Sequence, residues 1–489
     1  MLITKSDYLR FIQCPKFAWL FINRPDLVLP PDKNEQLKIE EGYQVETLAY
    51  KLFDSKDKII TEDKLQGSLE TEKYIKEGAK IIHQATFIVD ELYCRSDILK
   101  FNNETNKFDI YEIKATTEVD KQHIKDLAFQ KIVLEKQGLS IGETYVVHVN
   151  NQYIRNGEID INQYFSIENK TIEVIEKLEE VKNEISKLKE VLTFKEELNV
   201  EILSQCKNPE TCNFIDYCQK DIPDDSIYNF QFRENKLMNL IDEGIIHAKD
   251  IPDSYLTNDL KKYYVESLNT GKPHIEKDKI KEELSKLKYP LYFLDYETLN
   301  PAIPMFNGYK PYQRVVFQYS LHIQQTPYSE LEHFEFLGKE NTDPSIDLVK
   351  TLKEIIKDDN GSVIVWNKSF EMGCNREMAE RYPNYNNFLL NVNERVFDLM
   401  DIFHDAYYVD GRFHGSWSIK KVLPILVPEL SYKELNIKEG MTASNSWREM
   451  ILEERFTQED RDKIHKDLTT YCHLDTLAMV KILNYLNNI

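Results

Sequence analysis

Two acidic residues stand at the end of an apolar stretch just past the middle of the 489-residue chain, in the run Leu291-Tyr-Phe-Leu-Asp-Tyr-Glu-Thr-Leu299. The apolar run predicts a buried β-strand. Because side chains alternate along a strand, Asp295 and Glu297 point to the same face. Two carboxylates placed in this way repel each other unless a cation lies between them, and Mg²⁺ or Mn²⁺ prefers carboxylate oxygens. Two ordinary surface acids at a strand end are the alternative.

Further candidate residues lie closer to the C-terminus. Glu371 follows a strand predicted at 362–366 and stands at the start of a helix, where an acid ordinarily complements the helix dipole. Tyr471 and Asp475 are four residues apart on the last predicted helix, so they share a face, while His473 points elsewhere. These residues strengthen the interpretation of the strand-end acids as metal ligands.

This constellation resembles the DEDD exonucleases of the RNase H-like fold, and more narrowly their tyrosine subclass. The resemblance implies that Tyr471 orients or deprotonates the attacking water. It also implies two metal ions with four carboxylate ligands, which are Asp295, Glu297, Glu371 and Asp475. The wider family has aspartate where this chain has Glu371, and Asp398 is the substitute candidate. Cys374 and Cys472 are interpreted as core thiols.

A second group of charged residues lies in the first half of the chain. The sequence predicts a strand over 88–101 and, after a polar turn, a returning strand over 108–114. Asp97 could reach the face that Glu112 and Lys114 share. Two carboxylates with an adjacent ammonium suit phosphodiester hydrolysis, because the acids hold a divalent cation and the lysine neutralises developing charge or orients water. An exposed hairpin with ordinary cross-strand charge pairs is the alternative.

A helix predicted over 119–138, which carries Gln130, and a strand over 144–149 come next. The order helix, strand, strand, helix, strand resembles the core of the RecB-like nucleases of the PD-(D/E)XK superfamily. The resemblance makes Glu46, on an earlier predicted helix, the first-motif ligand, where many such nucleases carry histidine. The other site residues that it implies are Asp97, Glu112, Lys114 and Gln130.

Three of the seven cysteines, Cys206, Cys212 and Cys218, cluster in a short segment, as in structural metal sites. A fourth ligand is missing locally, and the candidate is Cys14, on a single apolar helix predicted from Leu9 to Phe21. This arrangement resembles the iron–sulfur RecB-like nucleases, which include CRISPR-associated and AddB-type proteins, although two of their three clustered cysteines lie closer together. The resemblance implies a 4Fe-4S cluster, and a Cys₄ Zn²⁺ site is the runner-up.

Composition and length set the frame for these motifs. The net charge of −21 excludes a basic nucleic-acid coat, so any nucleic acid must bind through local grooves and metal ions. The N-terminus lacks a signal-peptide core and the run 17–22 is too short to span a bilayer, so we expect a cytoplasmic protein with no membrane partner. The α/β chain is expected to comprise a restriction-endonuclease-like domain (1–222), a helical connector (223–285) and an RNase H-like exonuclease domain (286–489).

Taken together, the two resemblances cover nearly the whole chain and indicate a bacterial family that fuses both kinds of nuclease. We expect a metal-dependent DNA nuclease with Mg²⁺ or Mn²⁺ at two active sites, exonucleolytic on single strands or ends. Its role would be DNA repair or defence against foreign DNA. One alternative is an RNA-processing 3′–5′ exoribonuclease whose N-terminal half only grips the substrate. Another is a non-catalytic nucleic-acid-binding scaffold.

Overall fold

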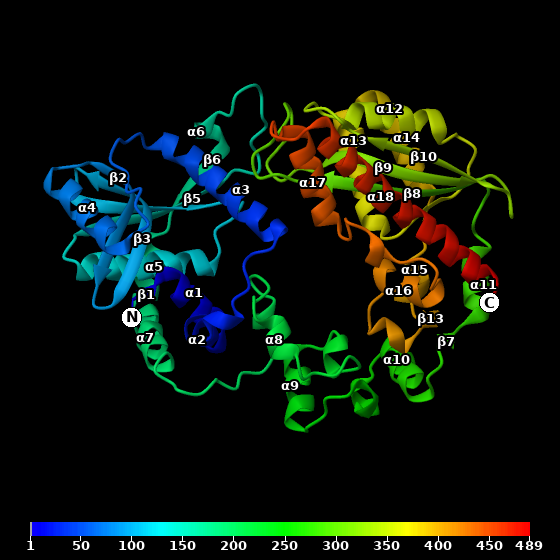
Figure 1. The fold of residues 1–489 in the computed structure, drawn as a ribbon, viewed down its shortest axis with the longest axis horizontal. Coiled ribbons are helices and arrows are strands. Elements are labelled where there is room, and N and C mark those ends of the chain that lie inside the picture. Colours follow the sequence, from blue (N-terminus) through cyan, green and yellow to red (C-terminus); the bar gives the residue numbers. More distant parts are fainter. Residues whose placement is uncertain (1) are drawn as a thin grey trace. The chain divides into compact units, whose positions relative to one another are not determined.

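The computed structural model describes residues 2–489 and divides the chain into two compact units (Figure 1). Unit 1 consists of Met1–Asp221 and Pro301–Gln313, and unit 2 of Ile222–Asn300 and Arg314–Ile489. Each unit combines helices with its own β-sheet, so the chain is of the α/β class. Residues 223–285, expected as a connector, lie in unit 2.

The sheet of unit 1 is mixed. β2, β3 and β4 pair antiparallel in succession, and β1 pairs parallel with the start of β3. β4 and β5 are parallel, as their connection through helix α5 (Lys121–Lys136) requires, and β6 closes the edge antiparallel to β5. The strands are β1 (Ile3–Thr4), β2 (Ile81–Val89), β3 (Leu92–Asn102), β4 (Lys107–Lys114), β5 (Ile141–Val149) and β6 (Phe165–Asn169).

Helices cover both faces of this sheet. Alternate strand residues enter different cores: Leu99 and Ile110 pack on the side of α5, whereas Ile98 and Tyr111 pack on the side of α3. Asp97 and Glu112 therefore point toward α5, because they share parity with Leu99 and Ile110. The remaining helices of unit 1 are α1 (Lys5–Gln13), α2 (Pro15–Asn23), α3 (Lys33–Ala49), α4 (Lys64–Lys76), α6 (Ile161–Tyr164), α7 (Thr171–Val191) and α8 (Ile215–Gln219).

Two expectations for unit 1 are wrong in their detail. The strand expected over 88–101 is interrupted by a hairpin turn at Asp90 and Glu91, both with positive φ (47° and 67°). The single helix expected around Cys14 is two helices, α1 and α2. Pro15 opens the second, and a residue before proline is disfavoured in the helical conformation, so Cys14 is extended (φ −159°, ψ 122°).

A segment from far along the chain completes unit 1. Residues 301–313 leave the end of β8 and pack within unit 1. The Glu41 carboxylate accepts a hydrogen bond from the Ala302 amide at 2.8 Å, and the Arg155 guanidinium donates to the Pro304 carbonyl at 2.7 Å. Unit 1 is therefore built from two separate stretches of sequence.

Unit 2 contains a five-stranded sheet in the order β10-β9-β8-β11-β12. β10, β9 and β8 pair antiparallel in succession, and β11 runs parallel to both β8 and β12. The strands are β8 (Leu291–Leu299), β9 (Val315–Gln324), β10 (Leu331–Leu337), β11 (Val363–Val365) and β12 (Val396–Asp398).

The two faces of this sheet are covered by different helices. α12 (Ser345–Ile355), α13 (Lys368–Arg381) and α14 (Asn386–Glu394) pack on one face, with Tyr319 and Leu321 in the shared core. The long α18 (Gln458–Asn487), red in Figure 1, crosses the other face, where the Gln318 amide donates to the Leu468 carbonyl at 3.0 Å. Side chains alternate along β9, so Gln318 and its even-numbered neighbours face α18, whereas Tyr319 and Leu321 face the opposite core.

The rest of unit 2 is largely helical. Residues 222–285 form α9 (Glu234–Asp242), α10 (Asp259–Thr270) and α11 (Lys277–Leu284). Their core joins Leu240 and Tyr264 to Val409, and β7 (His274–Ile275) pairs with β13 (Tyr408–Val409). Further helices are α15 (Asp401–His404), α16 (Ile419–Leu426) and α17 (Gly440–Leu452).

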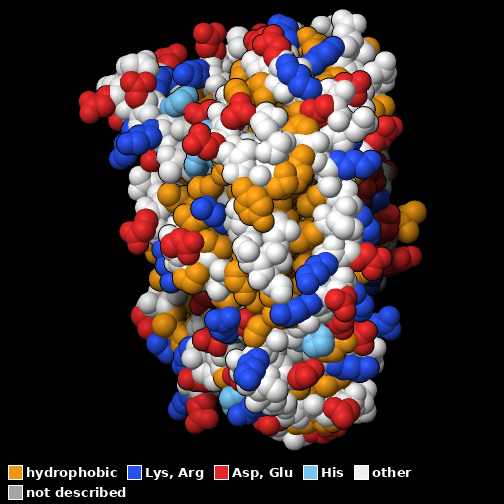
Figure 2. All heavy atoms as spheres, turned by 90° about the vertical axis from the view of Figure 1, so that its right-hand side faces the viewer, with side chains coloured by type: hydrophobic (Ala, Val, Ile, Leu, Met, Phe, Trp, Pro, Cys, Tyr) orange, Lys and Arg blue, Asp and Glu red, His pale blue; other side chains and the backbone are white. Residues whose placement is uncertain are grey.

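The surface carries both signs of charge. On the face drawn in Figure 2, acidic and basic side chains are interspersed and apolar side chains gather along the middle. Within the described residues, no helix combines the length and apolarity needed to cross a membrane.

Candidate functional site

In unit 2, β8, α13 and α18 bring acidic side chains and a tyrosine to one cavity of about 240 Å³, which residues of α16 and α17 also line. Asp295 and Glu297 come from β8, at the centre of the sheet, and Tyr471 and Asp475 from one turn of α18. Glu371 lies in the first turn of α13. All five residues expected at the C-terminal site are therefore brought together.

Hydrogen bonds fix several of these groups. The Tyr432 hydroxyl donates to Asp475 Oδ1 at 2.5 Å, and the Cys472 thiol donates to Asp295 Oδ2 at 3.5 Å. Glu371 Oε2 is buried without a hydrogen-bond partner. Cys472 was expected to be a core thiol; it is buried, but its sulfur and one oxygen each of Asp295 and Glu297 all lie within 4.8 Å of one another. Burial and the neighbouring acids raise the pKa of Cys472, so its thiol stays protonated and acts as a hydrogen-bond donor to Asp295.

The carboxylates of this cavity repel one another. Burial raises the pKa of Asp295, Glu297 and Glu371 well above the ordinary value, and neighbouring carboxylates raise it further. Burial also raises the pKa of Asp475 to about 6. The Lys420 ammonium opposes the shifts of Asp295, Glu297 and Asp475 without cancelling them. Oxygen donors with uncompensated negative charge fit a hard divalent cation, so this donor set suits Mg²⁺ or Mn²⁺.

The alternative ligand Asp398 has a different task. Its carboxylate accepts hydrogen bonds from the backbone amides of Asn367 (3.0 Å), Lys368 (2.7 Å) and Met400 (3.1 Å). These bonds anchor the N-terminus of α13, the helix that carries Glu371. Asp398 does not line the acidic cavity, whereas Glu371 does.

The charged group of unit 1 is organised around Glu112, which is 2% exposed. Its carboxylate accepts hydrogen bonds from Lys5 Nζ at 2.7 Å, Lys114 Nζ at 2.8 Å and Gln130 Nε2 at 2.6 Å. Lys114 also donates to Asp126 Oδ2 at 2.7 Å. The expected residues Glu112, Lys114 and Gln130 are thus in contact, and two ammonium groups already compensate the charge of Glu112.

Asp97 and Glu46 stand beside this group. Asp97 Oδ2 accepts from the Ile113 amide at 2.8 Å. The Gln84 side chain donates to Asp97 Oδ1 at 3.4 Å and also to Glu46, which accepts from the Tyr50 hydroxyl as well. Burial and the nearby Glu112 raise the pKa of Asp97. In unit 1, Lys5 and Lys114 already donate to Glu112, and the Ile113 amide and Gln84 donate to Asp97, so less negative charge is left for a cation here than among the acids of unit 2.

Sequence reasoning missed several residues of both sites. Asp126 precedes Gln130 by four residues, so their common helix face was a signal that could have found it. Lys5 carried no such signal, because it comes from the start of α1, more than a hundred residues from Glu112. In unit 2, Tyr432 and Lys420 reach the acids from segments whose proximity depends on the tertiary fold.

The four expected cluster cysteines lie around the joint between α1 and α2. The Gln13 amide donates to the carbonyls of Gln205 (2.9 Å) and Glu210 (2.8 Å), which holds the loop of Cys206 against the end of α1. Burial raises the pKa of Cys212 to about 11. Burial also raises the pKa of the thiols of Cys206 and Cys218, and Cys14 contributes to all three shifts, which places its thiol beside them.

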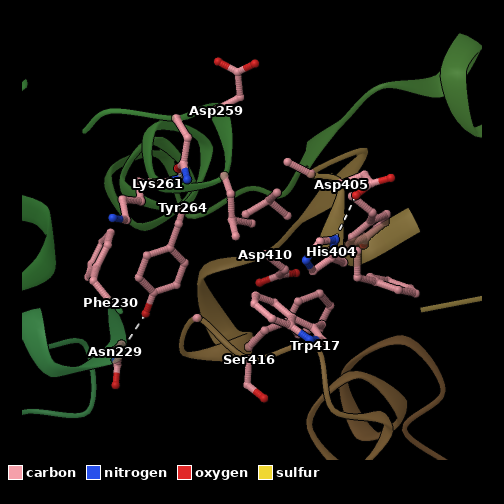
Figure 3. Close-up of a pocket in the computed structure, with 18 of the residues that line it drawn as sticks. Asn229, Phe230, Asp259, Lys261, Tyr264, His404, Asp405, Asp410, Ser416 and Trp417 are labelled. Atoms are coloured by element: carbon pink, nitrogen blue, oxygen red, sulfur yellow. Dashed lines mark hydrogen bonds and ion pairs between the residues drawn. The ribbon is translucent and has the colours of Figure 1, made fainter. Parts of the chain in front are cut away.

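A larger cavity of about 450 Å³ lies elsewhere in unit 2 (Figure 3). Phe230, Tyr264 and Trp417 contribute aromatic rings, and His404 pairs with Asp405 at 2.8 Å. This cavity shares no lining residue with the acidic one. Its mixture of rings and scattered polar groups lacks a compact donor set, so we assign the candidate chemistry to the smaller cavity.

Comparison with known families identifies a match over residues 292–418, to a model described as "Domain of unknown function (DUF2779)". The matched segment carries Asp295, Glu297 and Glu371, and Tyr471 and Asp475 lie beyond it. A solved structure entitled "Crystal structure of SSO0001" aligns over 44% of this chain and 83% of its own, with 14% identity. Its TM-score of 0.21 is too low to support an argument about the fold.

Two relatives come from Mycoplasma genitalium and Ureaplasma parvum. "Uncharacterized protein MG366" of Mycoplasma genitalium is 26% identical over 246 residues, which is 46% of this chain and 36% of the relative. "Uncharacterized protein UU173" of Ureaplasma parvum is 30% identical over 219 residues, which is 40% of this chain and 31% of the relative. The chain spans about a third of the length of these curated relatives. The matches together fit a family of unknown function.

Proposed function

We propose that this chain is a metal-dependent nuclease and that unit 2 carries its principal hydrolytic site. The observation that carries the proposal is the convergence of Asp295, Glu297, Glu371 and Asp475 on one cavity beside Tyr471. An excess of buried carboxylates is destabilising unless cations bind there, so its presence favours a catalytic use. The donor set supports an exonuclease site of the RNase H-like, DEDD type with tyrosine.

The side chains take distinct roles in this proposal. Asp295, Glu297, Glu371 and Asp475 hold two Mg²⁺ or Mn²⁺ ions, which supply a polarised phosphate and an activated water when bound. Burial and Asp475 raise the pKa of Tyr471, so its hydroxyl keeps its proton and orients the water by hydrogen bonding. Lys420, whose ammonium lies 5.4 Å from the Tyr471 ring centre, compensates negative charge at the phosphate.

We propose a second nuclease site, of the RecB-like PD-(D/E)XK type, in unit 1. Asp97 and Glu112 are its cation ligands, with Glu46 as a further acid, and Lys114 neutralises developing charge. Gln130 positions Glu112 through its 2.6 Å hydrogen bond. Because Lys5 and Lys114 already contact Glu112, cation binding must compete with an ammonium. This competition predicts weaker metal binding in unit 1 than in unit 2.

The four cysteines are proposed to hold a 4Fe-4S cluster. A tetrahedral zinc ion with Zn–S bonds of about 2.3 Å would hold its four sulfurs about 3.8 Å apart. No three of the sulfurs of Cys14, Cys206, Cys212 and Cys218, all described, lie within 4.8 Å of one another. A multi-iron cluster holds its cysteine sulfurs farther apart than one zinc ion does, so the lack of a compact sulfur trio among these four residues favours the cluster. Such a cluster would join the α1–α2 joint to the 206–218 loop.

The proposed substrate is DNA, as single strands or ends, in repair or in defence against foreign DNA. With a net charge of −21 and interspersed surface charges, attraction to phosphate must come mainly from the bound cations and a few local lysines (Figure 2). Binding and cleavage should therefore depend steeply on both the divalent cation and the salt concentration.

End-labelled single- and double-stranded DNA and RNA, incubated with the full chain and Mn²⁺, test this proposal. We expect metal-dependent release of nucleotides. In an Asp97→Asn background, which removes the unit 1 activity, Asp295→Asn should reduce this release at least about a hundredfold, the order of loss typical of essential catalytic groups. Asp347→Asn, an exposed acid of α12, is the matched control and should keep full activity. Asp97→Asn separates the unit 1 activity.

Each outcome discriminates between the readings. Cleavage of RNA but not DNA would replace the proposed substrate by RNA. Nucleic-acid binding without any metal-dependent cleavage would identify a scaffold and overturn the proposal. Full activity in both Asp295→Asn and Asp97→Asn would exclude both sites.

A further inference from the structure

Three histidines that the acidic site does not use meet on the same face of the unit 2 sheet. His322 on β9 is the direct cross-strand neighbour of His333 on β10, and α18 places His473 over both. The ring centres lie 4.5 Å (His322–His333), 4.7 Å (His322–His473) and 4.3 Å (His333–His473) apart. One nitrogen from each ring lies within 4.8 Å of the other two.

Hydroxyl groups orient two of the rings. His322 Nδ1 lies 2.8 Å from Thr476 Oγ1, and His333 Nε2 lies 2.9 Å from Ser320 Oγ. The two hydroxyls are themselves 2.7 Å apart. In metal sites the ring nitrogen that does not bind the metal commonly makes a hydrogen bond that sets the tautomer and the ring orientation, and here the two hydroxyls can take that part. Within the described chain, the other nitrogen of each of these two rings makes no hydrogen bond.

The rings are suited to a metal for a second reason. Burial lowers the pKa of His322 to about 3 and of His333 to about 4, so both are neutral at physiological pH with a free lone pair. A plain stack of neutral rings in a core is the alternative. Such a stack would not bring one nitrogen of each ring together. Here the nitrogens do converge, at the sheet edge, where His333 and His473 are only half-buried and an ion from solvent has access.

The histidine cluster is separate from the acidic cavity although it lies under the same helix. Ser320 pairs across the strands with Asp295, and His322 stands two residues further along β9. The donor chemistry also differs. Carboxylate oxygens select Mg²⁺ or Mn²⁺, whereas three imidazoles select borderline transition ions such as Zn²⁺ or Co²⁺.

We propose that His322, His333 and His473 form a binding site for one Zn²⁺-like transition-metal ion. A tetrahedral ion with Zn–N bonds of about 2.1 Å holds its nitrogens about 3.4 Å apart, so a small rotation of the rings closes the site. Water or the carboxylate of Glu335, on the same face of β10 as His333, takes the fourth position. The ion would fasten α18, with Tyr471 and Asp475, to the edge of the sheet.

Co²⁺ and Zn²⁺ are the probes for this site. The full chain is stripped with chelator and titrated with Co²⁺, and bound metal is counted by elemental analysis after gel filtration. We expect wild type to bind one more equivalent of Zn²⁺ than His333→Gln or His473→Gln, and Zn²⁺ to displace Co²⁺ from that site. His404→Gln, a histidine in the larger cavity, is the matched control and should bind as wild type. Asp295→Asn should also keep the extra equivalent.

Two results would overturn the inference. One is equal Zn²⁺ stoichiometry in wild type, His333→Gln and His473→Gln. The other is a difference signal that shows sulfur ligation in X-ray absorption, which would assign the ion to the cysteines. Thermal unfolding guards against a folding artefact: Zn²⁺ should raise the Tm of the unit 2 transition in wild type and not in His333→Gln. Asp295→Asn should lose the cleavage activity of unit 2 and still bind the extra equivalent of Zn²⁺. The zinc site and the nuclease site can therefore fail or hold independently of each other.

Discussion

At the scale of single residues, the acidic cavity makes the metal-free protein sensitive to pH. Folding raises the pKa of Asp475 to about 6, and it raises that of Asp295, Glu297 and Glu371 as well. Between the ordinary carboxyl pKa and about 6, the folded state therefore binds more protons than the unfolded state, and the free energy of unfolding falls as pH rises. We expect the unit 2 Tm, in EDTA, to be higher at pH 5 than at pH 7.

Calorimetry with and without Mg²⁺ tests this expectation. Mg²⁺ should restore the Tm at pH 7, because the cation stabilises the ionised carboxylates. Asp475→Asn removes one of the repelling charges, so it should raise the metal-free Tm at pH 7 and flatten the pH dependence. A metal-free Tm that rises from pH 5 to pH 7 would contradict the electrostatic description of the cavity.

At the scale of elements, the joint between α1 and α2 depends on the cysteines that surround it. The extended conformation of Cys14, just before Pro15, separates α1 from α2, so no helical hydrogen bonds run through the joint without interruption. The 205–210 loop holds the joint instead, through the hydrogen bond from the Gln13 amide to the Gln205 carbonyl. We expect Cys206→Ala, or chelation, to lower the free energy of unfolding of unit 1 by several kcal/mol, on the order of the loss of a structural metal ligand. The unfolding of unit 2 should stay unchanged.

A matched buried thiol of the same unit controls for packing. Cys94→Ala removes a thiol on β3 outside the cluster and should cost only about 1 kcal/mol, as a small core truncation does. Equal losses in Cys206→Ala and Cys94→Ala, measured by differential scanning calorimetry, would show that Cys206 is only a core residue.

The elements also show what the sequence could predict. β8 is predicted from its apolar run, and the regular geometry of a strand and of a helix then puts Asp295 with Glu297 and Tyr471 with Asp475 on common faces. The boundaries of the strands are harder to predict, because Asp90 is the only turn-favouring residue at the hairpin and no glycine, proline or asparagine accompanies it. Contacts of Lys5 or Tyr432 depend on the assembled fold, and local patterns contain no information about them.

At the scale of the whole molecule, the two units are interleaved in sequence. Residues 301–313 belong to unit 1, although unit 2 supplies the chain on both sides of them. Arg155 holds this segment through Nη1, which donates to the carbonyls of Pro304 (2.7 Å) and Met305 (2.8 Å). The Tyr164 hydroxyl adds a hydrogen bond of 3.0 Å to the Ala302 carbonyl. The stability of unit 1 should therefore depend on a segment that follows its first stretch of chain only after residues 222–300 of unit 2.

Arg155→Ala in the full chain measures this dependence. Arg155→Ala removes the two charge-assisted hydrogen bonds to residues 304 and 305 and a local one from Nε to the Gly157 carbonyl, and this loss from a half-buried guanidinium should lower the free energy of unfolding of unit 1 by about 2 kcal/mol. The unit 2 transition should stay in place, because the lost contacts lie within unit 1. Lys73→Ala, an exposed cation of unit 1 whose ion pair with Glu77 is 3.9 Å long, should cost less than about 0.5 kcal/mol. If Arg155→Ala lowers both transitions equally, the division into two units does not describe how the chain unfolds.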